Sequence, residues 1–257
     1  MPLSVISPNT IKPSSRRIFL SVVVPMWNEE HRVERGIEAV SDWLRSASYT
    51  SELVLIDDGS TDRTHSRLYD AAQRACGGNL VSANIHVHEK NQGKGAAIRT
   101  GLGLGAGDWF LLTDIDMSTP ISEVEKLLAR ARKDQAALVA GSRSVRGAKV
   151  SCLPHRFLAG RIFQLAARKN GLGWLKDSQC GFKLVRQDLA ERLHSALEET
   201  GYLFDLEMVG LAMRWGFGVA EEGVVWKHQN GSKVNLLRDG ARMWKDLERL
   251  GKKFASG

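Results

Sequence analysis

The sequence predicts an α/β protein built on a mostly parallel, doubly wound sheet flanked by helices. Short apolar runs, typical of strands buried on both faces, recur through the first half of the chain. Each run ends in a polar or glycine-containing turn, and a segment with helical apolar spacing follows. Four consecutive strand–helix units favour right-handed crossovers, which bring the carboxyl ends of the strands to one edge, where such sheets bind ligands.

The first two units are bounded by turn residues. We expect the first strand over residues 18–24, closed by Pro25 because proline cannot continue a central strand. The helix after it is expected over residues 28–45, where apolar side chains recur every three to four positions. The second unit repeats this pattern, with a strand over residues 52–56 and a helix over residues 63–75.

The third unit contains a glycine-flanked lysine. Its strand is expected over residues 85–88 and its helix over residues 96–104, with Gly93 and Lys94 between them. Backbone amides and a cation at the start of a helix suit a phosphate. The full phosphate-loop pattern is absent, so a plain helix start is the alternative.

The fourth strand, residues 109–112, is followed by two carboxylates one residue apart, Asp114 and Asp116. Side chains alternate along extended backbone, so both carboxylates are expected to face one point. Hard oxygen ligands of this kind suit Mg²⁺ or Mn²⁺, especially where a diphosphate supplies further oxygens. The alternative is that the two residues cap a helix over residues 118–125.

The second half of the chain carries weaker signals. A fifth strand is expected over residues 137–140, ending near Arg143, and a last strand over residues 223–226. Helical spacing predicts helices over residues 156–169 and 204–214. The apolar side of the first is expected to pack in the core, with contact to a lipid as the alternative. It is formed by Phe157, Leu158, Ile162, Leu165 and Ala166.

The C-terminal segment, residues 231–257, predicts a basic amphipathic helix. Such a helix either lies on an anionic membrane surface or packs on the domain with its basic side in water. Its apolar face is formed by Leu236, Met243, Leu247, Leu250 and Phe254.

Composition sets limits on the class of protein. The net charge of +7 favours anionic partners, which are nucleic acid, an acidic membrane surface or phosphorylated substrates. Three widely spaced cysteines fit reduced thiols, and no apolar stretch approaches the length of a membrane span. Residues 1–17 lack the apolar core of a signal peptide, so the expected location is cytoplasmic.

Several strings together resemble the inverting glycosyltransferases of family two, which have the GT-A fold. They match in order and spacing and are Val23–Glu30, Ile56–Asp62, Asn91–Gly95 and Thr113–Asp116. Three further strings, residues 177–184, 204–207 and 231–233, are most similar to dolichyl-phosphate β-glucosyltransferases, followed by polyprenyl-phosphate mannosyltransferases. The resemblance implies a GT-A domain over residues 17–230. We expect a flexible tail over residues 1–16 before it and the basic helix over residues 231–257 after it.

The resemblance also implies roles for individual residues. Asp116 and Asp205 are expected to be catalytic, and Asp114 and Asp116 to hold Mg²⁺ or Mn²⁺. The nucleotide-binding residues implied are Pro25, Trp27, Glu29, Ile56, Asp58, Gly93, Lys94 and Asp114.

Three basic residues are candidates for an acceptor phosphate, because cationic side chains, and guanidinium groups above all, bind phosphate oxygens. They are Arg143, Arg156 and Lys183. A solvated basic surface is the alternative for each of them.

These expectations describe a metal-dependent inverting enzyme that moves a hexose from a nucleotide diphosphate sugar, with UDP-glucose favoured, to a polyprenyl or dolichyl phosphate. The alternative is a family-two transferase that uses GDP-mannose or another donor on a hydroxyl and needs Asp205 as a base. A peripheral membrane or nucleic-acid-binding module would need none of the polar residues at the carboxyl ends of the strands. Nucleic acid is therefore not an expected partner. A peripheral position on the inner face of the membrane stays open, and the oligomeric state is not predicted.

Overall fold

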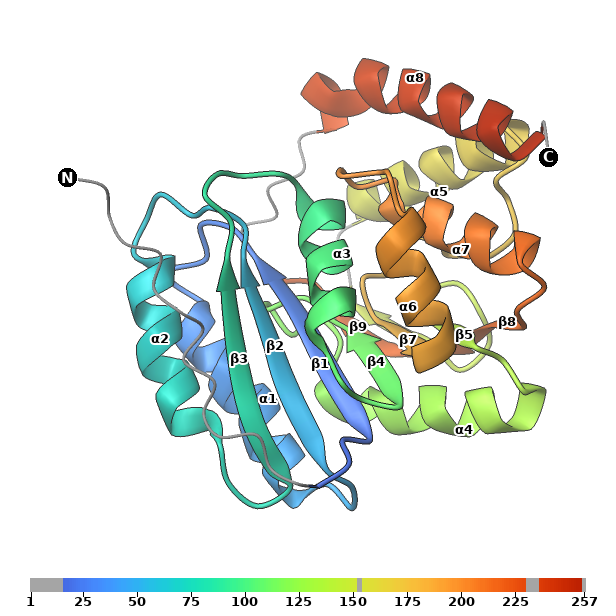
Figure 1. Ribbon diagram of the computed structural model, residues 1–257. Coiled ribbons are helices and arrows are strands. Elements are labelled where there is room, and N and C mark those ends of the chain that lie inside the picture. Colours follow the sequence, from blue (N-terminus) through green and yellow to red (C-terminus); the bar gives the residue numbers. More distant parts are fainter. Residues whose placement is uncertain (1–15, 152–153, 230–235, 256–257) are drawn as a thin grey trace. The chain divides into compact units, whose positions relative to one another are not determined.

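The computed structural model describes residues 16–151, 154–229 and 236–255, with no side chains described for residues 154–159 and 236–243 (Figure 1). The chain divides into two compact units, Met1–Met117 with Val185–Ala196, and Ser118–Leu184 with Leu197–Gly257. Each unit is described by itself.

The first unit is a parallel sheet with the strand order β3-β2-β1-β4. Figure 1 shows α1 and α2 on one face of these strands and α3 on the other. Its described elements are β1 (Leu20–Met26), α1 (Val33–Ser46), β2 (Ser51–Asp57), α2 (Thr64–Ala75), β3 (Leu80–Val87), α3 (Lys94–Leu104), β4 (Trp109–Leu112) and α6 (Gln187–Ala196).

These strands could be predicted from apolar runs in the sequence because they are buried. Every residue of β2 is buried, and so are all residues of β1 except Pro25. Strand β4 has the predicted bounds, 109–112. A strand covered on both faces needs a continuous apolar run rather than an alternating one, which is the pattern that the sequence shows.

The prediction that Pro25 closes the first strand is wrong, because β1 continues to Met26 and Pro25 pairs with Ile56 of β2. The neighbour on the other side, β4, ends at Leu112, whose register partner is Val23. Beyond that point β1 has no β4 residue to accept a hydrogen bond, so the missing N–H of proline is tolerated.

Strand β3 begins at Leu80, earlier than the predicted residue 85, because Ser82 and Asn84 interrupt its apolar pattern. Two of its polar side chains donate to the buried carboxylate of Glu52: Ser82 Oγ at 3.5 Å and Asn84 Nδ2 at 3.3 Å. Ser21 Oγ and the amide of Ala106 donate to the same carboxylate, each at 2.6 Å. The strand is therefore stabilised by a satisfied polar cluster, which an apolar pattern does not reveal.

The second unit contains two parallel strand pairs, β5 with β8 and β6 with β9. The predicted last strand over residues 223–226 is wrong, because the chain passes from β8 to β9 at the buried Val224, whose amide donates to Ser142. Strand β7 (Lys183–Arg186) is shared between the units. The other described elements are η1 (Ile121–Glu123), α4 (Val124–Asp134), β5 (Leu138–Ser142), β6 (Lys149–Ser151), α5 (Pro154–Lys169), α7 (Phe204–Arg214), β8 (Val219–Gly223), β9 (Val225–Lys227) and α8 (Leu236–Ala255).

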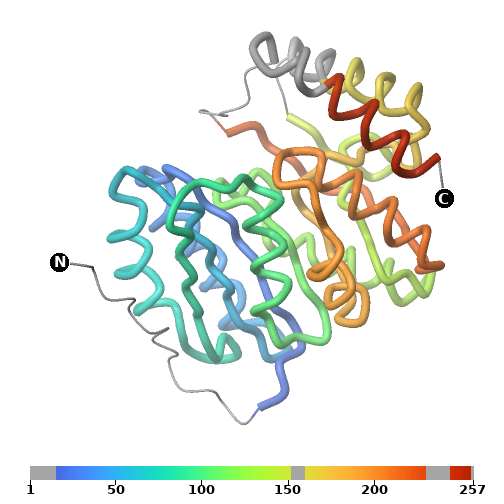
Figure 2. The backbone as a smooth tube through the Cα atoms, turned by 45° about the horizontal axis from the view of Figure 1, so that its top comes forward, coloured from blue at the N-terminus to red at the C-terminus, as the bar shows by residue number. Residues whose placement is uncertain are grey.

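The C-terminal helix α8 packs on its own unit, and Figures 1 and 2 show it beside α5. Leu247 and Leu250 are buried in a cluster with residues of α5 and α7, such as Phe163 and Leu206, and Phe254 packs against it. Of the two predicted arrangements, packing on the domain is therefore confirmed for this part of α8. Leu236 and Met243 lie outside the described side chains. None of the helices in the described part of the chain has the length and hydropathy of a membrane span.

Candidate active site

The loops after β1 and β2 are joined by side-chain hydrogen bonds. Asn28 has a left-handed backbone, with φ 54°, and its amide donates to Ser60 Oγ at 2.9 Å. In return the amide of Thr61 donates to Asn28 Oδ1 at 2.8 Å. The two loops are therefore held together at the carboxyl edge of the first unit's sheet.

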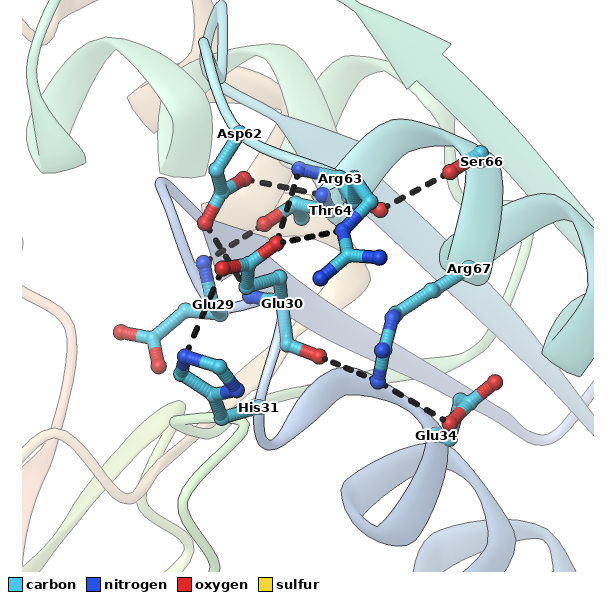
Figure 3. Close-up of polar contacts among 9 residues, drawn as sticks. All are labelled: Glu29, Glu30, His31, Glu34, Asp62, Arg63, Thr64, Ser66 and Arg67. Carbon is cyan, nitrogen blue, oxygen red and sulfur yellow. Dashed lines mark hydrogen bonds and ion pairs between the residues drawn. The ribbon is translucent and has the colours of Figure 1, made fainter.

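A second set of bonds continues this junction toward α2 (Figure 3). The amides of Glu30 and Thr64 donate to the two oxygens of Asp62, at 3.3 and 2.9 Å. The backbone and guanidinium of Arg63 donate to Glu30 and hold the pKa of that carboxyl below its usual range. The amide of Glu29 donates to Thr64 Oγ1, while its carboxylate points away from the group drawn in Figure 3.

Asp58, which follows β2, binds the loop after β3 through hydrogen bonds to its carboxylate. Its carboxylate, almost fully buried, accepts from the amides of Gln92 at 2.9 Å and Gly93 at 2.8 Å, and from Asn91 Nδ2 at 3.0 Å. His88 Nδ1 lies 2.7 Å from the same carboxylate. Asp58 therefore orders the turn that begins α3, and Gly93 there has φ 101°, a conformation that favours glycine.

Lys94 and Asp114 lie together. Lys94 Nζ donates to Asp114 Oδ1 at 2.6 Å, so the cation at the start of α3 already neutralises one of the two carboxylates after β4. Both groups are partly exposed to solvent.

The backbone between the two carboxylates is a turn. The amide of Met117 donates to the carbonyl of Asp114 at 3.2 Å, and Met117 has φ 51°. The prediction of an extended backbone from Asp114 to Asp116 is therefore wrong. Ile115 is buried against Gly36 of α1, and Asp116 is half-buried.

The other predicted nucleotide-binding residues differ in exposure. Ile56 is fully buried in β2, so only its backbone is available to a ligand. Pro25 is partly exposed beside it in the register of β1. Trp27 is an exposed aromatic side chain one residue beyond β1.

In the second unit, Arg143 is bound by the buried carboxylate of Asp177. Arg143 Nε and Nη2 donate to the two carboxylate oxygens at 2.7 and 2.8 Å, and the Arg143 amide donates at 2.8 Å. Its guanidinium carbon lies 5.5 Å from the ring centroid of Trp226. Burial alone would raise the pKa of Asp177, but the bonds and charge of Arg143 outweigh it and hold that pKa below its usual range.

Lys183 forms a buried ion pair with Asp205. Lys183 Nζ has no exposed surface and donates to Asp205 Oδ1 at 2.6 Å and to the carbonyl of Cys180. Burial raises the pKa of the neighbouring Cys180 thiol. The structure therefore brings Lys183 and Asp205 together, whereas the side chain of Arg156 lies outside the described residues.

Comparison with known proteins identifies the family. Residues 21–194 match the family described as Glycosyl transferase family 2. The chain belongs to that family. The glycosyltransferase is 31% identical to dolichyl-phosphate beta-glucosyltransferase of Homo sapiens, over 93% of this chain and 76% of the relative. It is 29% identical to the enzyme of that name from Saccharomyces cerevisiae, over 90% of this chain and 73% of the relative.

Solved structures share the fold of this glycosyltransferase. A crystal structure of glucosyl-3-phosphoglycerate synthase from Mycobacterium tuberculosis in complex with UDP has a TM-score of 0.64 and 19% identity, covering 95% of this chain and 86% of that one. A complex of the same synthase with Mn²⁺, UDP-glucose and phosphoglyceric acid has a TM-score of 0.61 and 21% identity, covering 90% and 77%. The predicted GT-A fold and the resemblance to family two are confirmed.

The carboxylates of the glycosyltransferase can hold a hard divalent cation only if a bound ligand supplies further oxygen atoms. Among the described residues, no group of three or more His, Cys, Asp or Glu side chains could hold a metal ion. Asp114 is paired with Lys94, so a cation there would compete with the lysine for this carboxylate. Mg²⁺ characteristically takes one or two carboxylates and completes its shell with substrate phosphates and water, so the residues fit.

The sequence assigned no role to two residues that the structure places at these sites. His88, expected at the end of a strand, bridges Asp58 and Thr100, with Nε2 3.0 Å from Thr100 Oγ1. Asp177, the first residue of the matched string over residues 177–184, holds Arg143. Both side chains are buried. A buried polar side chain needs a partner, but only the fold shows which one.

Proposed function

We propose that this glycosyltransferase transfers a hexose, with UDP-glucose as the favoured donor, to the phosphate of a polyprenyl lipid with inversion at the sugar carbon. The observation that carries the proposal is Arg143, which Asp177 holds in one orientation with donors left over. No described residue is bonded to its Nη1 group. The printed names of the relatives, which are dolichyl-phosphate glucosyltransferases, support the same acceptor.

The first unit supplies the donor-binding residues in this proposal. The ordered turn at Gly93 presents the amides that begin α3, and Lys94 adds a cation, so this segment suits a diphosphate. Glu29 and Trp27 lie at the edge that the nucleoside would use, with a carboxylate to accept from ribose hydroxyls and an aromatic face to stack on.

Asp116, assisted by Asp114, is the proposed ligand of Mg²⁺ or Mn²⁺. When bound, such a cation supplies Lewis-acid stabilisation to the departing diphosphate. Lys94 acts on the same developing charge through its ammonium group. Both effects lower the barrier because negative charge grows on the leaving group as its bond to the sugar breaks.

The acceptor phosphate is the proposed partner of Arg143. A phosphate oxygen attacks the sugar carbon from the face opposite the leaving diphosphate, one C–O bond forms as the other breaks, and the configuration inverts. A phosphate monoester has a second pKa of about 6 and is already largely ionised near neutral pH, so no base has to remove a proton.

Asp205 is therefore proposed to position substrate or backbone rather than to act as a base. It lies buried with Lys183 Nζ at 2.6 Å, and this partner holds the carboxylate in place. A transferase that acts on a hydroxyl would need Asp205 to accept a proton, so the two functions differ in what this residue must do.

The proposal is tested by release of nucleoside diphosphate from purified protein. UDP-glucose, GDP-mannose and other donors are compared with Mg²⁺ or Mn²⁺, with and without a short-chain polyprenyl phosphate. We expect lipid-dependent release from UDP-glucose that is lost in Asp116→Asn and retained in Asp70→Asn, a control on the exposed side of α2. Turnover that responds to a saccharide hydroxyl and not to the lipid phosphate would contradict it.

A further inference from the structure

Helix α5 has an unusual outer side. Ile162 and Leu165 are 59% and 64% exposed, more than any other large hydrophobic residue in the described part of the chain. Arg161, Arg168 and Lys169 are exposed on the same helix, and the sequence of α5 contains no Asp or Glu. Two aliphatic side chains are thus presented to solvent on a helix whose charged residues are all cationic.

Helical geometry places these five residues together. At about 100° per residue they fall within an arc of about 120°, with Leu165 near its centre. The opposite side of α5, which includes Phe163, Ala166 and Ala167, is buried in the cluster with Leu247 and Leu250. The outer arc, called here the α5 outer face, is therefore separate from the side that holds the helix to its unit.

We propose that the α5 outer face docks this glycosyltransferase on the surface of an anionic membrane. Charge complementarity selects this occupant, because three cations and no acid suit anionic headgroups while two aliphatic side chains suit the acyl boundary. Arg and Lys can bury their stems beside Leu165 and still reach lipid phosphates. The inference rests on the proposed function, since a polyprenyl phosphate is presented from a bilayer.

The inference also assigns the contact to a different helix from the one that the sequence favours. The apolar side of α8 is used for packing at Leu247 and Leu250, so it is not available to a membrane there. An apolar residue that helps hold the domain together cannot also enter a bilayer without unfolding that contact. The α5 outer face has no such conflict at Ile162 and Leu165.

The test is cosedimentation of the intact protein with vesicles of phosphatidylcholine alone or mixed with phosphatidylglycerol. The double variant Ile162→Ser/Leu165→Ser is compared with the matched control Leu104→Ser/Met213→Ser, which removes two aliphatic side chains that are 46% and 45% exposed elsewhere. We expect binding only to the mixed vesicles and a loss of about tenfold or more in the α5 variant. The control should bind like the wild type.

A charge variant gives a second, independent measurement. Arg168→Gln/Lys169→Gln should weaken binding to the mixed vesicles by about fivefold per cation at low salt, and high salt should remove the difference from the wild type. Equal binding of the wild type and both α5 variants would overturn the proposal. So would failure of the wild type to bind vesicles, or a concentration-dependent dimer that only the α5 variants lose.

Transfer to a dispersed short-chain polyprenyl phosphate separates this inference from the proposed function. The serine variant should keep that activity, because the substrate no longer has to be reached in a bilayer. Loss of vesicle binding with intact transfer supports the docking surface. Vesicle binding without any transfer to a lipid phosphate in the wild type would instead contradict the proposed function.

Discussion

The guanidinium of Arg143 is bound edge-on by the carboxylate of Asp177, with Nε to Oδ2 at 2.7 Å and Nη2 to Oδ1 at 2.8 Å. Asp177 is fixed in turn, because its own amide and that of Lys176 donate to Glu221 of β8 at 2.9 and 2.7 Å. A chain of bonds therefore sets the orientation of Arg143 before a ligand arrives. Such preorganisation reduces the entropy that is lost on binding.

Replacing Asp177 by Asn should release Arg143. An amide presents one acceptor where the guanidinium fork needs two, and the partly buried Arg143 cation loses its counter-charge. We expect the free energy of unfolding in urea to fall by about 2 to 4 kcal/mol, and the KM for the acceptor phosphate to rise more than the KM for the donor.

The matched control is Asp188→Asn, which breaks a similar two-bond pair with Arg186. Both partners of that pair are well exposed, so its loss should change stability by less than about 1 kcal/mol. Equal effects of the two substitutions would show that burial of the Arg143 pair has no energetic consequence.

The Asp177 pair should also make stability depend on pH at the acid end. The folded-state pKa of Asp177 is below its usual value, so its contribution is complete above the unfolded pKa of about 3.9 and is lost as pH falls through the folded value. The difference in unfolding free energy between wild type and Asp177→Asn should thus be constant from pH 7 to about pH 5 and shrink below about pH 4. A difference that grows on acidification would contradict the assignment.

Lys183→Met should be strongly destabilising, because it leaves the Asp205 carboxylate buried without a cation. We expect a loss of about 3 to 5 kcal/mol, and recovery of most of it in Lys183→Met/Asp205→Leu, where both charges are absent. Chemical denaturation of the two single variants and the double variant gives the coupling energy. Additive losses would mean that the pair is not coupled in solution.

Asp58→Asn should loosen the turn before α3. One amide oxygen cannot replace a carboxylate that accepts from two backbone amides and Asn91, so stability should fall by about 2 to 3 kcal/mol. Hydrogen exchange at Gln92 and Gly93 should accelerate and affinity for UDP should fall. The exposed Asp70→Asn serves as the control, and unchanged exchange in Asp58→Asn would show that other contacts order the turn.

Gly59→Ala tests how closely the loop after β2 approaches the loop after β3. Gly59 has φ 66°, and a Cβ there would meet the backbone of Lys90 and Asn91. Gly216→Ala is the matched control, because φ is 78° but a Cβ there would have open space. Backbone strain alone should cost about 1 to 2 kcal/mol at Gly216, and the collision should add to this at Gly59. Thermal unfolding of both variants measures the difference.

The strand–helix order of the first unit could be predicted from sequence because its strands are buried on both faces. β2 and β4 were located within one residue at each end, since a continuous apolar run carries the signal. The first half of β3 could not be found in this way, because Ser82 and Asn84 are stabilised by Glu52, which is distant in the sequence. Local patterns carry no information about such a partner.

The sequence by itself determined the family and the fold, because motif order and apolar periodicity are properties of the chain alone. Only the tertiary structure decided what the charged residues contact: Asp114 meets Lys94, Asp205 meets Lys183, and Arg143 meets Asp177. It also decided that Leu247 and Leu250 of α8 face the core while Ile162 and Leu165 of α5 face solvent. Both helices have apolar residues at helical spacing in the sequence. Which side of each is covered depends on what the fold packs against it, and periodicity alone does not contain that information.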